Sequence, residues 1–202
     1  MILKLKKKFG FLIPIVVIII VMTIGYMSIY SHNPFMELGS VAMSLFTANS
    51  GPRPAPELVG ITQWLNSEPL DIEELNTQGR VVLIDFWTYS CINCQRSIPY
   101  ISEWYDKYKD QGLVVIGVHT PEFRFEKNID NVITEMAKYP IRYPVAIDND
   151  YKTWRAYQNH YWPAKYLIDV HGNIVYSRFG EGAYNITEAK IQELLAEAES
   201  LQ

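Results

Sequence analysis

Residues 81–94 read Val-Val-Leu-Ile-Asp-Phe-Trp-Thr-Tyr-Ser-Cys-Ile-Asn-Cys, and this stretch decides the fold. Its first half is apolar apart from Asp85 and begins with β-branched residues, which is typical of a buried strand. The residues after Cys94 are amphipathic up to Gly112, so they predict a helix with one core-facing stripe. That stripe consists of Ile98, Ile101, Trp104, Tyr105 and Tyr108. Cys91 and Cys94 therefore stand where a strand ends and a helix begins.

The position of these two cysteines, the only ones in the chain, indicates redox chemistry. Unpaired N–H groups and the macrodipole at a helix N-terminus favour a thiolate, which is the form that attacks a disulfide. Cys91 is nearer the helix start and is expected to attack, whereas Cys94 is expected to resolve the mixed disulfide by closing a Cys91–Cys94 bond. A purely structural disulfide across so short a loop would constrain the unfolded chain very little. A zinc site would need further ligands, and the histidines stand in no ligand-pair spacing: His32, His119, His160 and His171.

Several motifs along residues 57–202 resemble the thioredoxin family. The spacing of Asp85-Phe86-Trp87, of the cysteine pair and of Pro99 is similar to the active-site strand and kinked helix of thioredoxin. Downstream, Trp162-Pro163 precedes a strand and a turn in the manner of the thioredoxin cis-proline segment. The sequence around these motifs resembles the TlpA-like membrane-anchored thioredoxins, and most closely the thioredoxin-like domain of DipZ-type proteins. The segments that carry this wider resemblance are residues 117–123 and 161–169.

The resemblance implies roles for three further residues. Asp85 would be a buried acid beneath the cysteines that takes the Cys94 proton through water. Pro163 would be cis and lie against the disulfide, with neighbouring backbone groups available to an extended substrate. Independently of the resemblance, we expect an aromatic rim around the site that consists of Tyr89, Trp154, Tyr161 and Trp162, and for Trp154 the alternative is core packing. Glu122 occupies the place of a glutamate that lies near the active cysteines in TlpA-like cytochrome-maturation thioredoxins. For Asp85 the alternative is a strand-end residue bonded to backbone, for Pro163 a simple turn proline, and for Glu122 a solvated surface residue.

The expected fold is α/β and thioredoxin-like, with a central mixed sheet flanked by helices and an inserted helix–strand segment. Residues 60–65 are expected to form an edge strand followed by a hairpin at residues 76–79. The inserted segment is expected to be a helix from Ile129 to Tyr139 and a strand over residues 143–147. The other expected elements are a strand over residues 113–118, a helix over residues 153–159, a strand over residues 165–169 and a final helix whose Ile191, Leu194, Leu195, Ala198 and Leu201 face the sheet.

The N-terminal part of the chain predicts a membrane anchor. We expect a basic cytoplasmic segment at residues 1–8, a transmembrane signal-anchor at 9–30, a flexible tether at 31–56 and the thioredoxin-like domain at 57–202. Residues 9–30 carry no charge, and at 1.5 Å per residue they would cross a bilayer core of ~30 Å. The preceding lysines favour a cytoplasmic N-terminus and an extracytoplasmic domain. A cleaved signal peptide is the alternative, with late cleavage points near Ala42 or Ala48.

Composition agrees with an exported redox domain. From residue 31 onward the chain carries 14 basic and 22 acidic residues, which argues against a nucleic-acid partner. A chain whose two cysteines both belong to one motif suits an oxidising compartment, where stray thiols would mispair.

These features predict an extracytoplasmic thiol–disulfide oxidoreductase that needs no dissociable cofactor or metal. By resemblance it reduces disulfides of exported proteins and receives electrons from a CcdA- or DsbD-like membrane thiol carrier, as in cytochrome c biogenesis. An oxidant or isomerase would use the same residues. A redoxin-type peroxidase would need a threonine three residues before its cysteine, which Thr88 supplies, and a proline seven before, where Ile84 stands. A copper-binding assembly protein would need a wider cysteine spacing and a histidine.

Overall fold

The computed structural model describes residues 53–201, which contain a mixed seven-stranded sheet of order β1-β7-β6-β3-β4-β5-β2. β3 lies at its centre, parallel to β4 on one side and antiparallel to β6 on the other. β4 and β5 are also parallel, whereas the remaining neighbours are antiparallel. The strands are β1 (Arg53–Pro54), β2 (Gln63–Leu65), β3 (Val81–Trp87), β4 (Leu113–His119), β5 (Val145–Ile147), β6 (Ala164–Ile168) and β7 (Asn173–Phe179).

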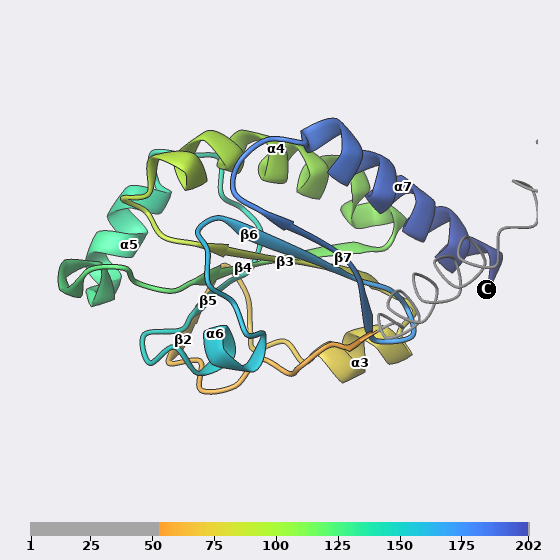
Figure 1. Cartoon of the computed structure of the whole chain (residues 1–202), viewed down its shortest axis with the longest axis horizontal. Coiled ribbons are helices and arrows are strands. Elements are labelled where there is room, and N and C mark those ends of the chain that lie inside the picture. Colours follow the sequence, from red (N-terminus) through yellow and green to blue (C-terminus); the bar gives the residue numbers. More distant parts are fainter. Residues whose placement is uncertain (1–52, 202) are drawn as a thin grey trace, which may run out of the picture. The chain divides into compact units, whose positions relative to one another are not determined.

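Helices cover both faces of this sheet. In Figure 1, α4 and α7 lie over one face, and α3 and α6 lie on the opposite side. The α-helices are α3 (Ile72–Thr77), α4 (Ile92–Tyr108), α5 (Ile129–Met136), α6 (Lys152–Ala156) and α7 (Tyr184–Ser200), and two 3₁₀ turns are η1 (Lys109–Gln111) and η2 (Arg124–Lys127). Each face has its own apolar core, one built with α4, α5 and α7 and the other with α3 and α6. The architecture is the thioredoxin-like α/β fold, and the inserted helix and strand predicted from the sequence are α5 and β5.

The strand and helix that flank the cysteines form as the sequence predicts. All seven residues of β3 are buried, because helices pack on both of its faces. In α4 the predicted stripe is buried except for Tyr105, which is partly exposed. Gly112 ends this region with φ +107°, a left-handed conformation that favours glycine.

The predicted hairpin has a different structure. The expected hairpin at residues 76–79 is instead the end of α3, whose first turn is capped by the Asp71 carboxylate accepting from the Glu74 N–H at 2.8 Å. Glu57 also accepts from the N–H groups of Ile72 and Glu73, so two acidic side chains hold this helix start. The sequence pattern was short and ended in Gly79, which suits a helix C-terminus as well as a turn.

The folded domain also begins earlier than residue 57. Arg53 and Pro54, assigned to the tether from their proline-rich surroundings, pair with β7 as an edge strand, and Ala55 donates to the Gly172 carbonyl at 2.8 Å. An edge strand tolerates proline, because one of its sides needs no donor. α6 is shorter than the predicted helix. At the C-terminal end, Leu201 follows the last turn of α7 and is exposed, so it does not face the sheet as predicted.

Within residues 53–201, no helix is long and apolar enough to cross a bilayer. The segment predicted to do so, residues 9–30, lies outside the described residues, as do the basic segment and most of the tether.

Candidate active site

The two cysteines lie at the carboxyl end of β3, where the chain turns into α4. Cys91 is the residue that caps the helix, in an extended conformation, and its sulfur accepts from the Cys94 N–H at 3.4 Å. Cys91 is partly exposed, whereas Cys94, one turn further on, is buried. Both thiols are free in this structure. The strand–helix junction therefore presents one sulfur to solvent and keeps the other inside.

The two thiols differ strongly in acidity. The pKa of Cys91 is lowered to about 7, chiefly by a hydrogen bond from the Cys94 thiol, with help from the N–H groups of Cys94 and Asn93 and against partial burial. Burial raises the pKa of Cys94, and its hydrogen bond to Cys91 raises it further. Near neutral pH the Cys91 thiolate and the Cys94 thiol therefore coexist, which is the arrangement that nucleophilic attack by Cys91 requires.

Asp85 lies beneath the cysteine pair, on the face of β3 that carries α4. It is 1% exposed, and burial raises its pKa to about 6 even though the Lys165 ammonium pulls the pKa down. The Asp85 charge in turn contributes to the raised pKa of Cys94, so the two groups interact. Of the two interpretations of Asp85, a backbone-bonded strand end and a buried acid, this placement favours the second. Its part in proton transfer stays a prediction.

Lys165 was not predicted as a site residue. It faces Asp85 across the β3–β6 pair, with its Nζ atom 3.6 Å from Oδ1 of the carboxylate. The sequence offers little signal for it, because it falls in the strand after Pro163 and reads like any alternating polar residue.

Glu122 is exposed, and its carboxylate raises the pKa of Cys91 only as the smallest of several influences. The carboxylate that the fold places in the active-site loop belongs to Glu126, which is fully buried. It accepts from the Ser90 hydroxyl at 2.6 Å and from the N–H groups of Ser90, Glu122 and Phe123 at 3.3, 2.6 and 2.8 Å. Burial alone would raise the pKa of Glu126, but these bonds and one from Thr88 bring it below its usual value. Glu126 thus ties the residue before Cys91 to the segment after β4.

A buried histidine also contacts the loop before Cys91. His119 Nε2 lies 3.4 Å from the Thr88 hydroxyl, and its ring stacks on Tyr89. Burial lowers the pKa of His119 to about 4, so it is neutral at physiological pH. These contacts give His119 a structural role in the loop.

The Trp162–Pro163 peptide bond is cis, as the resemblance implied. The Trp162 indole donates to the Thr120 carbonyl at 3.0 Å, which ties this segment to the end of β4. Trp162 and Cys91 both pack against the same apolar core. Of the expected aromatic rim, Trp162 is partly exposed and Tyr161 is exposed, whereas Tyr89 and Trp154 are buried core residues.

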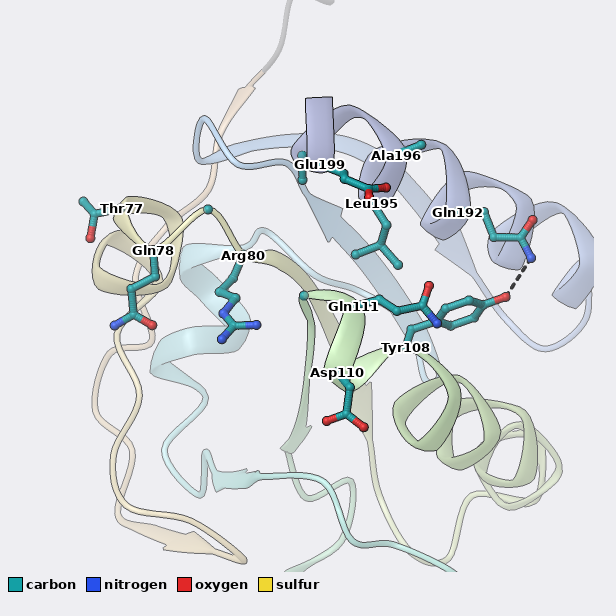
Figure 2. Close-up of a pocket in the computed structure, with 13 residues that line it drawn as sticks. Thr77, Gln78, Arg80, Tyr108, Asp110, Gln111, Gln192, Leu195, Ala196 and Glu199 are labelled. Carbon is teal, nitrogen blue, oxygen red and sulfur yellow. Dashed lines mark hydrogen bonds between the residues drawn. The ribbon is translucent and has the colours of Figure 1, made fainter. Parts of the chain in front are cut away.

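Residues 53–201 contain no group of three or more histidine, cysteine or acidic side chains arranged to hold a metal ion. A cavity of about 830 Å³ lies at the other end of β3, between the start of that strand and α7 (Figure 2). Its wall includes Arg80, Gly112, Leu195 and the hydrogen-bonded pair Tyr108 and Gln192. The cavity is remote from the cysteines, because Arg80 precedes β3 whereas the cysteines follow its last residue, Trp87.

Known proteins are similar to this chain over the domain that contains the two cysteines. A model of the AhpC/TSA family matches residues 54–177, and the chain belongs to this family. It is 33% identical over 147 residues to the thiol-disulfide oxidoreductase YkuV of Bacillus subtilis, covering 73% of this chain and 97% of YkuV. A solved structure of a thioredoxin-like protein in the oxidized form aligns with a TM-score of 0.64 at 31% identity, covering 72% of this chain and 97% of that one.

Within the family, the chain is a thiol–disulfide oxidoreductase of the TlpA/ResA type with a C-x-x-C pair. It is 56% identical over 147 residues to Protein DipZ of Mycobacterium tuberculosis. That match covers 71% of this chain and 21% of DipZ, so the chain spans about a fifth of the length of that relative.

Proposed function

We propose that this oxidoreductase is a membrane-tethered reductant of disulfides in exported proteins, working outside the cytoplasm. The observation that carries the direction is the moderate acidity of Cys91, with a pKa of about 7. The attacking cysteine has a pKa of about 7 in thioredoxin and about 3.5 in the oxidant DsbA, whose stabilised reduced form makes it oxidising. The charged group acting on Cys91 is Glu122, which disfavours the thiolate. A weakly stabilised thiolate favours giving electrons away.

The cycle uses the two sulfurs in sequence. The Cys91 thiolate attacks a substrate disulfide, forming a Cys91–substrate bond and releasing one substrate thiolate. Cys94 then loses its proton and attacks Cys91 Sγ, so the Cys91–Cys94 bond forms and the second substrate sulfur leaves and is protonated. Two electrons pass to the substrate. A membrane thiol carrier of the CcdA or DsbD kind would return the pair to the dithiol state.

The proposed location rests on the sequence of the N-terminal part. Four lysines precede an uncharged stretch of sufficient length at residues 9–30, and the rest of the chain is acidic. Protease added to intact spheroplasts should therefore degrade residues 57–202 and leave a cytoplasmic marker intact. Complete protection of the domain would overturn this topology.

A redox titration of the purified full-length chain tests the direction. We expect a reduction potential near that of thioredoxin, ~−270 mV, whereas a value near ~−120 mV would make the protein an oxidant. Peroxide consumption should be negligible, because buried Ile84 occupies the position where a redoxin-type peroxidase needs proline. Rapid turnover of hydrogen peroxide with a thiol donor would favour that alternative, and stoichiometric copper retention by the reduced protein would favour an assembly role.

A further inference from the structure

Two exposed aromatic side chains stand on the turn that follows β4. Phe123 and Phe125 are 50% and 55% exposed, and their rings stack nearly parallel with centroids 5.5 Å apart. Neither side chain belongs to the apolar core on either face of the sheet. Apolar side chains exposed singly need no explanation, whereas a contiguous group of them calls for one. The turn therefore presents an apolar surface that the fold itself does not use.

One buried carboxylate holds this turn against the active-site loop. Oε2 of Glu126 accepts from the N–H groups of Glu122 and Phe123 at 2.6 and 2.8 Å. Oε1 of the same side chain accepts from the hydroxyl and the N–H group of Ser90 at 2.6 and 3.3 Å. One oxygen thus binds the aromatic turn, and the other binds the residue before Cys91. Glu126 therefore fixes the position of the aromatic pair relative to the attacking sulfur.

A second link joins the aromatic pair to the same loop. Tyr89, two residues before Cys91, donates from its hydroxyl to the Phe125 carbonyl at 3.2 Å, and its ring centroid lies 6.2 Å from that of Phe125. The Asn131 side chain also donates to this carbonyl, at 3.2 Å. The backbone of Phe125 is therefore held without help from its ring. The exposed ring is continuous with the loop that carries Cys91, which a substrate disulfide has to approach.

We propose that Phe123 and Phe125 form a specificity subsite that holds a large apolar side chain next to the substrate cysteine, and that Glu126 is the positioning residue for this subsite. The occupant is an extended segment of the protein substrate with an aromatic or large aliphatic residue within two positions of its cysteine. At ~3.3 Å per residue, such a side chain starts within ~7 Å of the sulfur that Cys91 attacks. This inference rests on the dithiol cycle of the proposed function, but not on its direction or location.

The chemistry of the turn favours an apolar occupant over a charged one. The exposed residues 122–125 contain one acid, Glu122, and one base, Arg124, so this stretch has no net charge. Covering the two half-exposed rings with an apolar side chain removes apolar surface from water, and aromatic contacts add to this gain. Because Glu126 already holds the turn in place, little ordering of the subsite is needed on binding. A small polar side chain at the same position would gain none of this.

The first experiment compares two synthetic substrates. These are the disulfide-linked dimers of the peptides acetyl-Gly-Phe-Cys-Phe-Gly-amide and acetyl-Gly-Ser-Cys-Ser-Gly-amide. The rate constant for reduction of each by the reduced full-length chain is divided by that for dithiothreitol, which has no subsite. The resulting preference for the aromatic peptide should be about tenfold in wild type. It should fall below twofold in the double variant Phe123→Ser/Phe125→Ser.

A matched control replaces an exposed apolar residue elsewhere. Leu201 is 60% exposed and follows the last turn of α7, so Leu201→Ser should keep the wild-type preference. If the double variant does not fold, each single serine variant should lower the preference at least twofold. A wild-type preference below twofold, or a preference that the folded serine variants retain, would overturn the proposal. A retained preference together with loss of a dimer in sedimentation would instead assign the aromatic pair to self-association.

The second experiment tests Glu126 as the positioning residue. Glutamine has one acceptor oxygen and an NH₂ group that cannot accept, so Glu126→Gln cannot satisfy all four donors. The preference for the aromatic peptide should fall at least threefold in Glu126→Gln and stay at the wild-type value in Glu122→Gln, whose side chain makes none of these bonds. General loosening of the Cys91 loop would slow both peptides equally, so the preference separates positioning from a purely structural role.

Two further variants keep this test decisive. In the Phe123→Ser/Phe125→Ser background, Glu126→Gln should change the preference by less than twofold, because the subsite it positions is gone. If Glu126→Gln does not fold, Ser90→Ala removes only the 2.6 Å bond and should lower the preference at least twofold. An unchanged preference in folded Glu126→Gln, or in Ser90→Ala, would show that Glu126 does not position the subsite. The reduction potential is measured on the same samples, so a failure of the reductant assignment is seen independently.

Discussion

The loop beside Cys91 and the core beneath Cys94 each contain one fully buried carboxylate, and the two carboxylates have opposite surroundings. Glu126, in the loop, accepts from three backbone N–H groups and a hydroxyl, and its pKa is lowered. Asp85, in the core, has Lys165 at 3.6 Å, and its pKa is raised to about 6. Burial alone therefore does not decide the charge of a carboxyl group. Direct hydrogen-bond donors stabilise the anion, and without them burial favours the protonated form. Near neutral pH Glu126 therefore stays ionised, whereas Asp85 is close to its titration midpoint.

Removing each thiol in turn gives the largest expected effect. Cys94→Ser should accumulate covalent mixed disulfides with substrate proteins, because Cys91 can attack but nothing resolves the product. Cys91→Ser should trap almost none, because the buried Cys94 thiol has a raised pKa. Non-reducing gels of cells carrying each variant measure this. Equal trapping by the two variants would mean that Cys91 is not the attacking sulfur and Cys94 not the resolving one.

Replacing the loop carboxylate should affect stability most. Glu126→Ala leaves the donors of Ser90, Glu122 and Phe123 unpaired and should lower the free energy of unfolding by about 2–4 kcal/mol. Because the folded-state pKa of Glu126 is lowered, its contribution is present above the unfolded value near 4.5 and is lost as the pH falls through the folded value. Urea unfolding at several pH values tests this. The neighbouring exposed Glu122→Ala is the matched control and should change stability by less than about 0.5 kcal/mol.

Replacing the core carboxylate, Asp85, should change the pH dependence of stability in the opposite sense. The pKa of Asp85 rises from 3.8 to about 6 on folding, so its contribution is fully present below the unfolded value and is lost as the pH rises through the folded value. Wild type should therefore lose up to about 3 kcal/mol between pH 4 and 6 that Asp85→Asn does not lose. The exposed Asp110→Asn serves as control and should follow wild type. If Asp85→Asn keeps the wild-type pH profile of stability, Asp85 does not titrate in this range on folding.

The smallest effect is expected for Glu122. Its charge disfavours the Cys91 thiolate, so Glu122→Gln should lower the midpoint of Cys91 alkylation by a few tenths of a pH unit at low salt. The side chain is exposed, so 1 M salt should remove most of the difference. Iodoacetamide alkylation rates against pH measure the midpoint. If the profile is unchanged at low salt, Glu122 is a solvated surface residue, the alternative that its sequence position left open.

The sequence predicted most of the fold around the site, and for a local reason. An apolar run that begins with β-branched residues and leads to C-x-x-C, followed by an amphipathic stretch up to Gly112, predicts a strand, a turn and a helix, which are β3, the active-site loop and α4. Predictions were weaker where the pattern was short. Residues 72–77 became a helix because the carboxylates of Glu57 and Asp71 cap its start, and Glu57 is brought there from another segment.

What the sequence by itself determined was the identity of the reactive sulfurs, because their spacing and position at a helix start are local properties. Asp85 could also be named, because it lies on the same strand as the motif. The tertiary structure alone decided which charged groups surround them. Lys165 reaches Asp85 through the register of two strands 80 residues apart in the chain, and Glu126 in η2 is buried against Ser90, the residue before Cys91. Such pairings depend on strand register and loop path, which no short stretch of sequence specifies.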